Sequence, residues 1–362
     1  MDKIRQLIND VKEILNQLKE EKRGRSKKRR GRPIREEVLW EMVLIKLLAR
    51  VMKWNIRQTH RNLTSKDPTF RRLIGMRLSE IPPYRTLVHR WHNPKVYMYQ
   101  QRVYKRSLRR ILTKRNLRVT LIDMTDLPVS LKDDLAEWGY CSKGRLYGYK
   151  LHMVTSCDGI PIALVVSRGN LVESSVNERL IGRVERNLND DQIEKILYMV
   201  GDAGYDGEAN YDDVERILDA KLVCAVNPRR DADLKDLRGK GELSQEKRKQ
   251  LEESDSNRAR GILLYLTKRE ELYERRIWIE QSISILTTLL SMKDIPYWVR
   301  GVRRVARWVF DHIFAFVCIA YCNKKHGRRI RQVAVPGSDE YLLQTLISVF
   351  IMIFRPRSSW ER

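Results

Sequence analysis

The chain has 362 residues and a formal net charge of +25, from 71 Lys and Arg residues against 46 Asp and Glu residues. Hydrophobic residues make up 42% of it, enough to build buried cores for two or three domains. The strong positive charge predicts a polyanionic partner. Nucleic acid fits best, although an anionic membrane or ribosomal RNA would attract the same charge. Five irregularly spaced cysteines exclude a disulfide framework and favour a reducing, cytoplasmic location.

Two apolar stretches lie near the C-terminus. The stretch from Val305 to Cys322 is interrupted by charged residues, including Asp311. The stretch from Tyr341 to Phe354 is shorter than the roughly 20 apolar residues that a membrane-spanning helix needs. The chain also starts without an apolar signal segment. We therefore predict two buried core helices and no membrane partner.

The first 33 residues predict a helix followed by a basic linker. Over residues 1–21, apolar side chains recur at spacings of three and four: Ile4, Leu7, Val11, Ile14 and Leu18. This amphipathic helix either packs on its own domain or forms a dimerising coiled coil. The linker, residues 22–33, contains Arg30-Gly31-Arg32-Pro33, similar to the core of an AT-hook. Arg30 and Arg32 would enter a DNA minor groove in that case, or otherwise contact phosphates without sequence preference.

Residues 34–115 predict a helical domain that binds DNA. Apolar periodicity and turn residues predict helices that include Val38–Met52, Ile56–Leu63 and Tyr84–Trp91. The helix Tyr84–Trp91 carries Arg85 and Arg90 beside an apolar stripe. This pattern fits the recognition helix of a helix-turn-helix unit and fits equally well a bundle helix with a solvated basic face.

From residue 116 the pattern changes to alternating strands and helices. Five strands are predicted, namely Val119–Leu127, Tyr147–Thr155, Ile160–Ser167, Ile196–Gly201 and Lys221–Val226. Helices over Ser174–Leu188 and Tyr211–Ala220 separate the later strands. The order β-β-β-α-β-α-β, followed by a long helix, is that of a ribonuclease-H-like domain. We therefore predict an α/β fold, with a ribonuclease-H-like mixed sheet flanked by helices and an all-α N-terminal DNA-binding region.

The predicted boundaries follow from these patterns. The ribonuclease-H-like catalytic domain spans residues 116–325. A polar segment at about 229–262 shows no apolar period and predicts an insertion or mobile loop within that domain. Residues 326–362 then form a C-terminal tail and helix.

Three acidic residues stand out by their local contexts. Asp123 lies near the end of an apolar strand, and Asp202 follows the strand Ile196–Gly201. Glu280 lies on a predicted helix that presents Tyr273 and Arg276 on the same face, because the spacings are three and four residues. Each acid taken alone is more often a turn, a helix cap or a surface charge. Together they predict a site for two Mg²⁺ ions, which prefer carboxylate oxygens and promote attack on phosphodiesters.

These motifs resemble those of insertion-sequence DDE transposases of the IS4/IS5 type. The first motif, Asp-x-Thr after an apolar strand, is Asp123-Met124-Thr125. A Gly-x-Lys-x-His strand stands at Gly148–His152, and the second Asp motif stands at Val200–Asp206. The third motif is Tyr-x2-Arg-x3-Glu, here Tyr273, Arg276 and Glu280. The chain departs from the family where a Lys is expected seven residues after the Glu, because that position is Thr287.

The resemblance implies cut-and-paste DNA transposition. Metal-dependent cleavage at the transposon ends would free a 3′-OH, and that hydroxyl would attack target DNA. The catalytic residues and metal ligands would be Asp123, Asp202 and Glu280, with Mn²⁺ able to replace Mg²⁺. A homodimer would bind the inverted repeats and the target in a prokaryotic nucleoid. The predicted DNA contacts are Tyr273, Arg276, Lys150, Arg30, Arg32, Arg85 and Arg90.

Two alternatives keep part of this interpretation. A hydrolytic nuclease of the ribonuclease-H-like superfamily would cleave DNA without joining it. A domesticated DNA-binding protein would use only the basic N-terminal half, although the intact acidic motifs argue against it. Lys150 also fits ordinary alternation on a half-exposed strand.

A zinc site at the end of the chain is not expected. Cys318 and Cys322 lie near His312 and His326, but one straight helix cannot place four ligands tetrahedrally around an ion. We therefore predict that both cysteines belong to the core.

Overall fold

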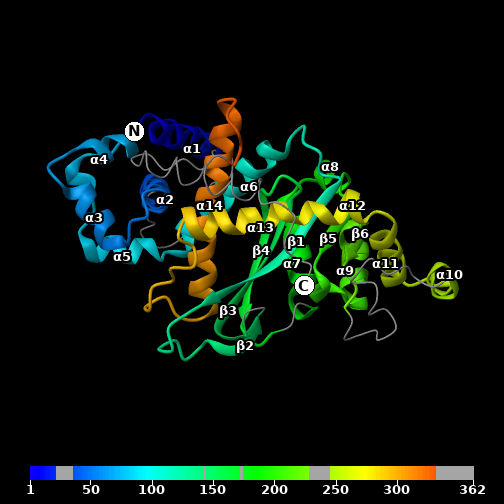
Figure 1. Ribbon diagram of the computed structural model, residues 1–362. Coiled ribbons are helices and arrows are strands. Elements are labelled where there is room, and N and C mark those ends of the chain that lie inside the picture. Colours follow the sequence, from blue (N-terminus) through cyan, green and yellow to red (C-terminus); the bar gives the residue numbers. More distant parts are fainter. Residues whose placement is uncertain (22–35, 142–143, 172–173, 228–244, 332–362) are drawn as a thin grey trace, which may run out of the picture.

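The structure is a computed structural model that describes residues 1–21, 36–141, 144–171, 174–227 and 245–331. A mixed sheet lies at its centre with helices on both faces (Figure 1). The described part of the sheet has six strands: β1 (Val119–Pro128), β2 (Glu137–Cys141), β3 (Gly144–Ser156), β4 (Pro161–Arg168), β5 (Tyr198–Gly201) and β6 (Lys221–Cys224). The predicted mixed α/β sheet flanked by helices is confirmed.

The strand directions follow a simple scheme. β3 is antiparallel to β1, β2 and β4, whereas β5 and β6 run parallel to β1. The order across the sheet is β2-β3-β1-β5-β6, and β4 also pairs with β3. β1, β3 and β4 are largely buried, as expected for strands that helices cover on both faces.

Most predicted strands and helices lie within a few residues of the observed ones, but β2 was not predicted. Its sequence, Glu-Trp-Gly-Tyr-Cys, has a central glycine, and Trp138 and Tyr140 are exposed. A short strand with exposed aromatic side chains lacks the apolar alternation that marks a half-buried strand.

An insertion or a mobile loop was predicted at about 229–262; the mobile loop is wrong for the second half of this segment, and the insertion stays a prediction. Residues 228–244 lie outside the described ranges, but α10 (Gln245–Glu253) and α11 (Asn257–Thr267) are regular helices. α11 packs on β6 and on α9 (Glu208–Leu218). Gly261 makes this contact possible, because a Cβ there would lie 2.2 Å from the Tyr211 ring and 2.5 Å from the Leu222 carbonyl oxygen. α10 is polar and has no buried residue, and the apolar part of α11 begins only at its sixth residue, Ile262, so the sequence of this segment gave no apolar period.

Helices form all the regular structure described before β1. They are α1 (Asp2–Glu20), α2 (Glu36–Val51), α3 (Ile56–Thr64), α4 (Thr69–Ile74), the short 3₁₀ helix η1 (Leu78–Glu80), α5 (Tyr84–Trp91) and α6 (Pro94–Leu112). The long C-terminal helix α14 (Val302–Lys325) packs against α1, α2 and α6 and also against β4. The N-terminal helices and the sheet therefore share one hydrophobic core.

The apolar face of α1 is covered within the same chain. Ile4, Leu7, Val11 and Ile14 are all buried, in contact with the layer formed by α2, α6 and α14. Of the two alternatives for this helix, packing on its own chain is the one observed. The apolar stripe is therefore not free to form a coiled coil.

One helix of the described residues, α14, is long and apolar enough to span a membrane, but 78% of its apolar window is buried inside the protein. The predicted core helix over Val305–Cys322 is confirmed. The second apolar stretch, Tyr341–Phe354, lies outside the described ranges, as do Arg30 and Arg32.

A buried ionic cluster joins α2, α6 and α14. The Asp311 carboxylate on α14 lies 2.9 Å from Lys46 Nζ and 3.8 Å from Arg50 Nη2, and it accepts a hydrogen bond from Gln100 Nε2 at 3.1 Å. The Lys46, Arg50 and Asp311 side chains are each only 5–6% exposed. Burial lowers the pKa of Lys46, and the negative charge of Asp311 opposes this effect. Asp311 is the anion that compensates both cations.

Candidate active site

The register of β1 and β5 places two aspartates side by side. In this parallel pair Leu121 stands opposite Val200, and an aspartate lies two residues after each of them: Asp123, within β1, and Asp202, just after β5. Parallel strands bring such equivalent positions to the same edge of a sheet. Asp202 also caps the short 3₁₀ helix η2 (Ala203–Tyr205), where it accepts a hydrogen bond from Gly204 N at 3.0 Å.

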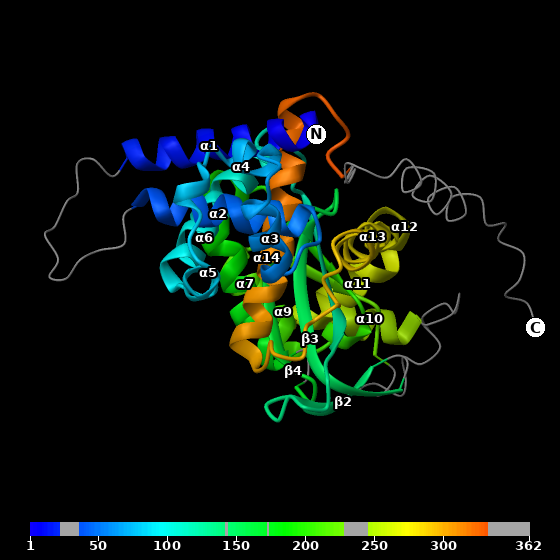
Figure 2. The ribbon, with the colours of Figure 1, turned by 90° about the vertical axis from the view of Figure 1, so that its left-hand side faces the viewer.

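Glu280 belongs to an almost continuous helical segment that packs against β1. This segment comprises α12 (Arg269–Leu272), the 3₁₀ turn η4 (Tyr273–Arg276), α13 (Ile277–Ser284) and a π-helical turn, Ile285–Leu289. Figure 2 shows α13 on one side of the sheet and α14 on the other. α13 contacts β1, and the Glu280 side chain is 60% exposed.

The hairpin between β3 and β4 anchors α13. Ser282 Oγ donates a 2.7 Å hydrogen bond to the Gly159 carbonyl oxygen. Gly159 has φ +77°, and a Cβ at this position would lie 2.2 Å from Ser282 Oγ and 2.8 Å from the Trp278 carbonyl oxygen. Both the left-handed backbone and the close helix therefore require glycine. The turn at Gly159 thus also helps to position the helix that carries Glu280.

The Arg276 guanidinium lies close to two of the three carboxylates, those of Asp123 and Glu280. Its Nη2 lies 3.3 Å from Asp123 Oδ2 and 3.9 Å from Glu280 Oε1, and its Nη1 donates to the Tyr273 hydroxyl at 3.0 Å. The neighbouring Arg275 instead donates from Nε to the Glu271 carbonyl oxygen. The predicted common face of Tyr273, Arg276 and Glu280 is therefore observed, and Arg276 rather than Arg275 faces the sheet.

Burial and nearby negative charges raise the pKa of Asp123. The residue is 8% exposed, and burial raises its pKa to about 6, with further increases from the charges of Asp202 and Glu280. The positive charge of Arg276 acts in the opposite direction but does not cancel these effects. Negative charge concentrated at one strand end is the arrangement that a bound cation would stabilise.

The three candidate carboxylates lie farther apart than the ligands of a single ion would. Among the described residues, one group of three potential ligands has all its ligand atoms within 4.8 Å of one another, and it is Asp10, Cys322 and His326. In the candidate active site, the Arg276 guanidinium instead lies between Asp123 and Glu280. Arg276 supplies the positive charge there.

Replacing Asp123 by Asn should stabilise the protein in the absence of divalent ions. Because the folded-state pKa of Asp123 is raised, its ionised form disfavours folding above pH 6, and the effect disappears below its unfolded pKa near 3.8. We expect the free energy of unfolding of Asp123→Asn to exceed that of the wild type by roughly 2 kcal/mol at pH 8. The difference should vanish near pH 4. Urea unfolding in EDTA at several pH values measures it, and equal stabilities at pH 8 would contradict this electrostatic account.

In the Gly148–His152 motif, the Lys150 and His152 side chains lie on the opposite face of the sheet from Asp123. Lys150 stands opposite Asp126 and His152 opposite Met124, and side chains alternate along a strand. Lys150 is 7% exposed and donates to the Leu171 carbonyl oxygen at 3.2 Å. Its assignment as a DNA contact stays a prediction.

His152 connects two of the sequence motifs. Its Nδ1 lies 3.3 Å from the hydroxyl of Tyr205, in the turn after Asp202, and its Nε2 lies 3.0 Å from Ser167 Oγ. Burial lowers the pKa of His152 to about 3, so the ring is neutral. A neutral, buried imidazole at this place supports the turn that carries Asp202.

The sequence was compared with models of known protein families. The model described as "Transposase DDE domain" matches residues 114–308, from just before β1 to within α14. This chain belongs to the DDE transposase family. The matched segment of the transposase contains Asp123, Asp202 and Glu280. Membership implies an enzyme that binds, cleaves and transfers DNA, and DDE domains generally use divalent metal ions. A search among curated proteins found no match.

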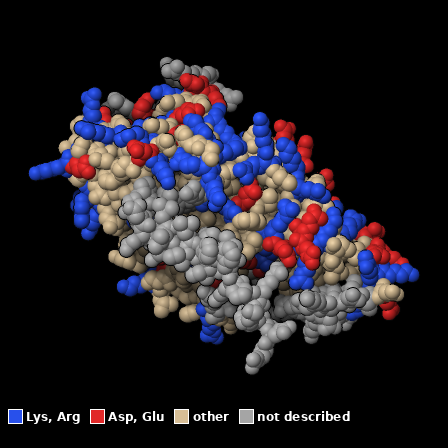
Figure 3. All heavy atoms as spheres, turned by 45° about the horizontal axis from the view of Figure 1, so that its top comes forward, with Lys and Arg blue, Asp and Glu red and all other residues tan. Residues whose placement is uncertain are grey.

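The basic residues predicted on α5 of the transposase face outward. Arg85 is exposed and Arg90 is partly exposed, whereas Leu87 and Trp91 are buried. Figure 3 shows Lys and Arg side chains spread over one face of the molecule, with Asp and Glu among them. The charge is therefore distributed rather than confined to a single uniform patch on this face.

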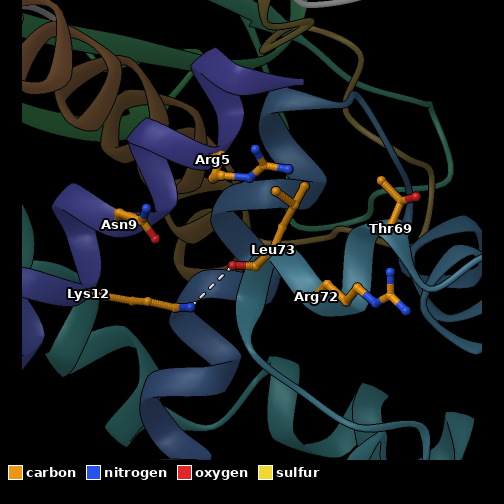
Figure 4. A pocket seen from close by; sticks show the side chains of 6 residues that line it. All are labelled: Arg5, Asn9, Lys12, Thr69, Arg72 and Leu73. Carbon is orange, nitrogen blue, oxygen red and sulfur yellow. Dashed lines mark hydrogen bonds between the residues drawn. The ribbon is translucent and has the colours of Figure 1, made fainter.

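A basic cleft between α1 and α4 was missed by the sequence analysis. Its volume is about 270 Å³, and none of its lining residues is acidic: Arg5, Asn9, Lys12, Thr69, Arg72 and Leu73 (Figure 4). Lys12 Nζ donates to the Leu73 carbonyl oxygen at 3.2 Å, and burial lowers the pKa of Lys12. In the sequence, the basic residues of α1 resemble an ordinary solvated helix face, so the cleft depends on the packing of α4.

Proposed function

We propose that this protein is an IS4/IS5-type transposase that performs cut-and-paste DNA transposition with Asp123, Asp202 and Glu280 as its catalytic carboxylates. The observation that carries the proposal is the Arg276 guanidinium, which contacts Asp123 and Glu280 beside the strand end that holds Asp202. A ribonuclease-H-like fold is supported by the antiparallel β1, β3 and β4 followed by β5 and β6 parallel to β1.

The same carboxylates would hold two Mg²⁺ ions, with Mn²⁺ able to replace them. Their oxygen-only donor set suits these hard cations. Burial, together with the charges of Asp202 and Glu280, raises the pKa of Asp123, and a bound cation would stabilise its ionised form. When bound, such ions activate the attacking oxygen and stabilise the leaving oxygen of a phosphodiester.

Arg276 and Tyr273 would bind the DNA strand next to the carboxylates. The Arg276 side chain is 16% exposed, so part of it can be reached from solvent. Its Nη1 hydrogen bond to Tyr273 fixes the orientation of the guanidinium plane. A planar donor group of this kind suits phosphate oxygens.

More distant DNA contacts would come from the helical N-terminal half. Arg85 and Arg90 on α5, together with the cleft residues Arg5, Lys12 and Arg72, would neutralise phosphates along the duplex. Arg30, Arg32 and Lys150 remain proposed contacts on sequence grounds. A homodimer would provide one active site for each transposon end. Because the apolar face of α1 is already buried, the dimer would use another surface.

The reaction products test the proposal. Purified protein is incubated with Mg²⁺, target plasmid and linear DNA that carries the inverted repeats flanking the gene. We expect joined products in which the element's 3′ ends are linked to target DNA. Release of a 3′-OH without joining would favour the hydrolytic nuclease instead. Binding without any cleavage by the full-length protein, whatever divalent ion is supplied, would favour a domesticated DNA-binding protein.

A further inference from the structure

The end of α14 lies against α1 and brings together three metal-ligating side chains that are not part of the candidate active site. Cys322 and His326 are one helical turn apart, and Asp10 faces them from α1. Their ligand atoms, one from each residue, all lie within 4.8 Å of one another. Figures 1 and 2 both show α1 beside this end of α14. The third ligand therefore comes from a different helix, which the sequence alone did not reveal.

The spacing of two of these ligands suits a tetrahedral ion. His326 Nε2 lies 3.2 Å from Asp10 Oδ2. Two ligands that bind Zn²⁺ tetrahedrally at about 2.0–2.1 Å stand about 3.3 Å apart. Asp10 and Cys322 are only 4% and 3% exposed, whereas the His326 side chain is 34% exposed. The group is thus nearly buried, with His326 as its contact with solvent.

Two charged neighbours, Lys325 and Arg328, contact the ligands Asp10 and Cys322. Lys325 Nζ lies 2.8 Å from Asp10 Oδ1, the oxygen that does not face His326, and 2.6 Å from Glu13 Oε2. Arg328 Nη2 lies 3.7 Å from Cys322 Sγ. Lys325 therefore orients the carboxylate from outside the ligand set, and Arg328 would stabilise a thiolate.

We propose that Asp10, Cys322 and His326 form a Zn²⁺ site that links α1 to α14. A thiolate and an imidazole favour Zn²⁺ over Mg²⁺, which prefers oxygen ligands only. Three protein ligands leave the fourth position to water. Because Cys322 binds Zn²⁺ as a thiolate, binding would displace the proton of this thiol. The site is independent of the proposed catalytic function.

Metal content of the full-length protein tests this site. After equilibration with Zn²⁺ and gel filtration, we expect one Zn²⁺ per chain by mass spectrometry. Substitution by Co²⁺ should give a sulfur-to-metal charge-transfer band. Cys322→Ser and His326→Ala should each weaken Zn²⁺ binding at least about tenfold, since even outer partners of a metal site change affinity by about 10–100-fold.

The matched control is Cys157→Ser, which changes a cysteine outside the group. This variant should keep wild-type Zn²⁺ binding. Circular dichroism checks the fold of each variant, and the partly exposed His326 makes His326→Ala the safer one. A wild type that binds no Zn²⁺, or a folded His326→Ala that binds it as tightly as the wild type, would overturn the proposal.

Discussion

Asp202→Asn should abolish Mg²⁺-dependent nicking of transposon-end DNA and leave DNA binding intact. Asn keeps the shape of the side chain and can still accept the hydrogen bond from Gly204 N that Asp202 accepts now. It lacks the negative charge that a divalent ion requires. We expect the nicking rate to fall by at least about a hundredfold, a loss typical for removal of one preorganised electrostatic group. Gel-based nicking and filter-binding assays measure the two properties separately.

Asp191→Asn is the matched control for the loss of one negative charge. Asp191 is exposed on the short helix α8 (Asp190–Ile193), which precedes β5, whereas Asp202 follows the other end of that strand. The control should nick at the wild-type rate. Full nicking by Asp202→Asn would reject its assignment as a catalytic carboxylate.

Asp311→Ala should destabilise the protein by about 3–5 kcal/mol, the usual effect of removing one partner from a buried ion pair. The substitution leaves Lys46 and Arg50 without their shared anion, and both side chains are almost completely buried. Gln100 also loses the acceptor for its Nε2. Urea unfolding at pH 7 gives the change in the free energy of unfolding.

The buried cluster has two cations and one anion, so the loss of one cation should affect stability less than the loss of the anion. Lys46→Met should be less destabilising than Asp311→Ala, because Arg50 still compensates the Asp311 charge and the methionine side chain fills the space. Asp255→Ala, at a fully exposed aspartate, should change stability by less than about 0.5 kcal/mol. An effect of Asp311→Ala as small as that of Asp255→Ala would show that the buried cluster contributes little to stability.

Much of the fold follows from local sequence patterns. The apolar runs of β1, β3, β4 and β5 and the amphipathic face of α1 are strong signals, because strands and helices bury their side chains with different periods. α10 was missed because it is polar and buries no residue, and α11 because its apolar residues begin only at Ile262. Only the tertiary contact at Gly261 shows why α11 packs where it does.

The sequence named the candidate catalytic residues but not the interactions around them. The Tyr273, Arg276 and Glu280 spacing predicted one helix face, yet only the fold shows that Arg276 reaches Asp123, 153 positions earlier in the chain. The contact between His152 and Tyr205 joins two motifs whose relation no spacing rule provides. The same limit applies to Asp10 and Cys322, because pairings between distant helices depend on packing rather than on local periodicity.

The metal preference of Asp202→Cys shows whether these carboxylates bind the divalent ions used for cleavage. A thiolate is a softer ligand than a carboxylate, so it should disfavour Mg²⁺ more than Mn²⁺. We expect the ratio of the nicking rate with Mn²⁺ to that with Mg²⁺ to rise at least about tenfold in Asp202→Cys relative to the wild type. An unchanged ratio, with substantial nicking by the variant in Mg²⁺, would contradict this expectation.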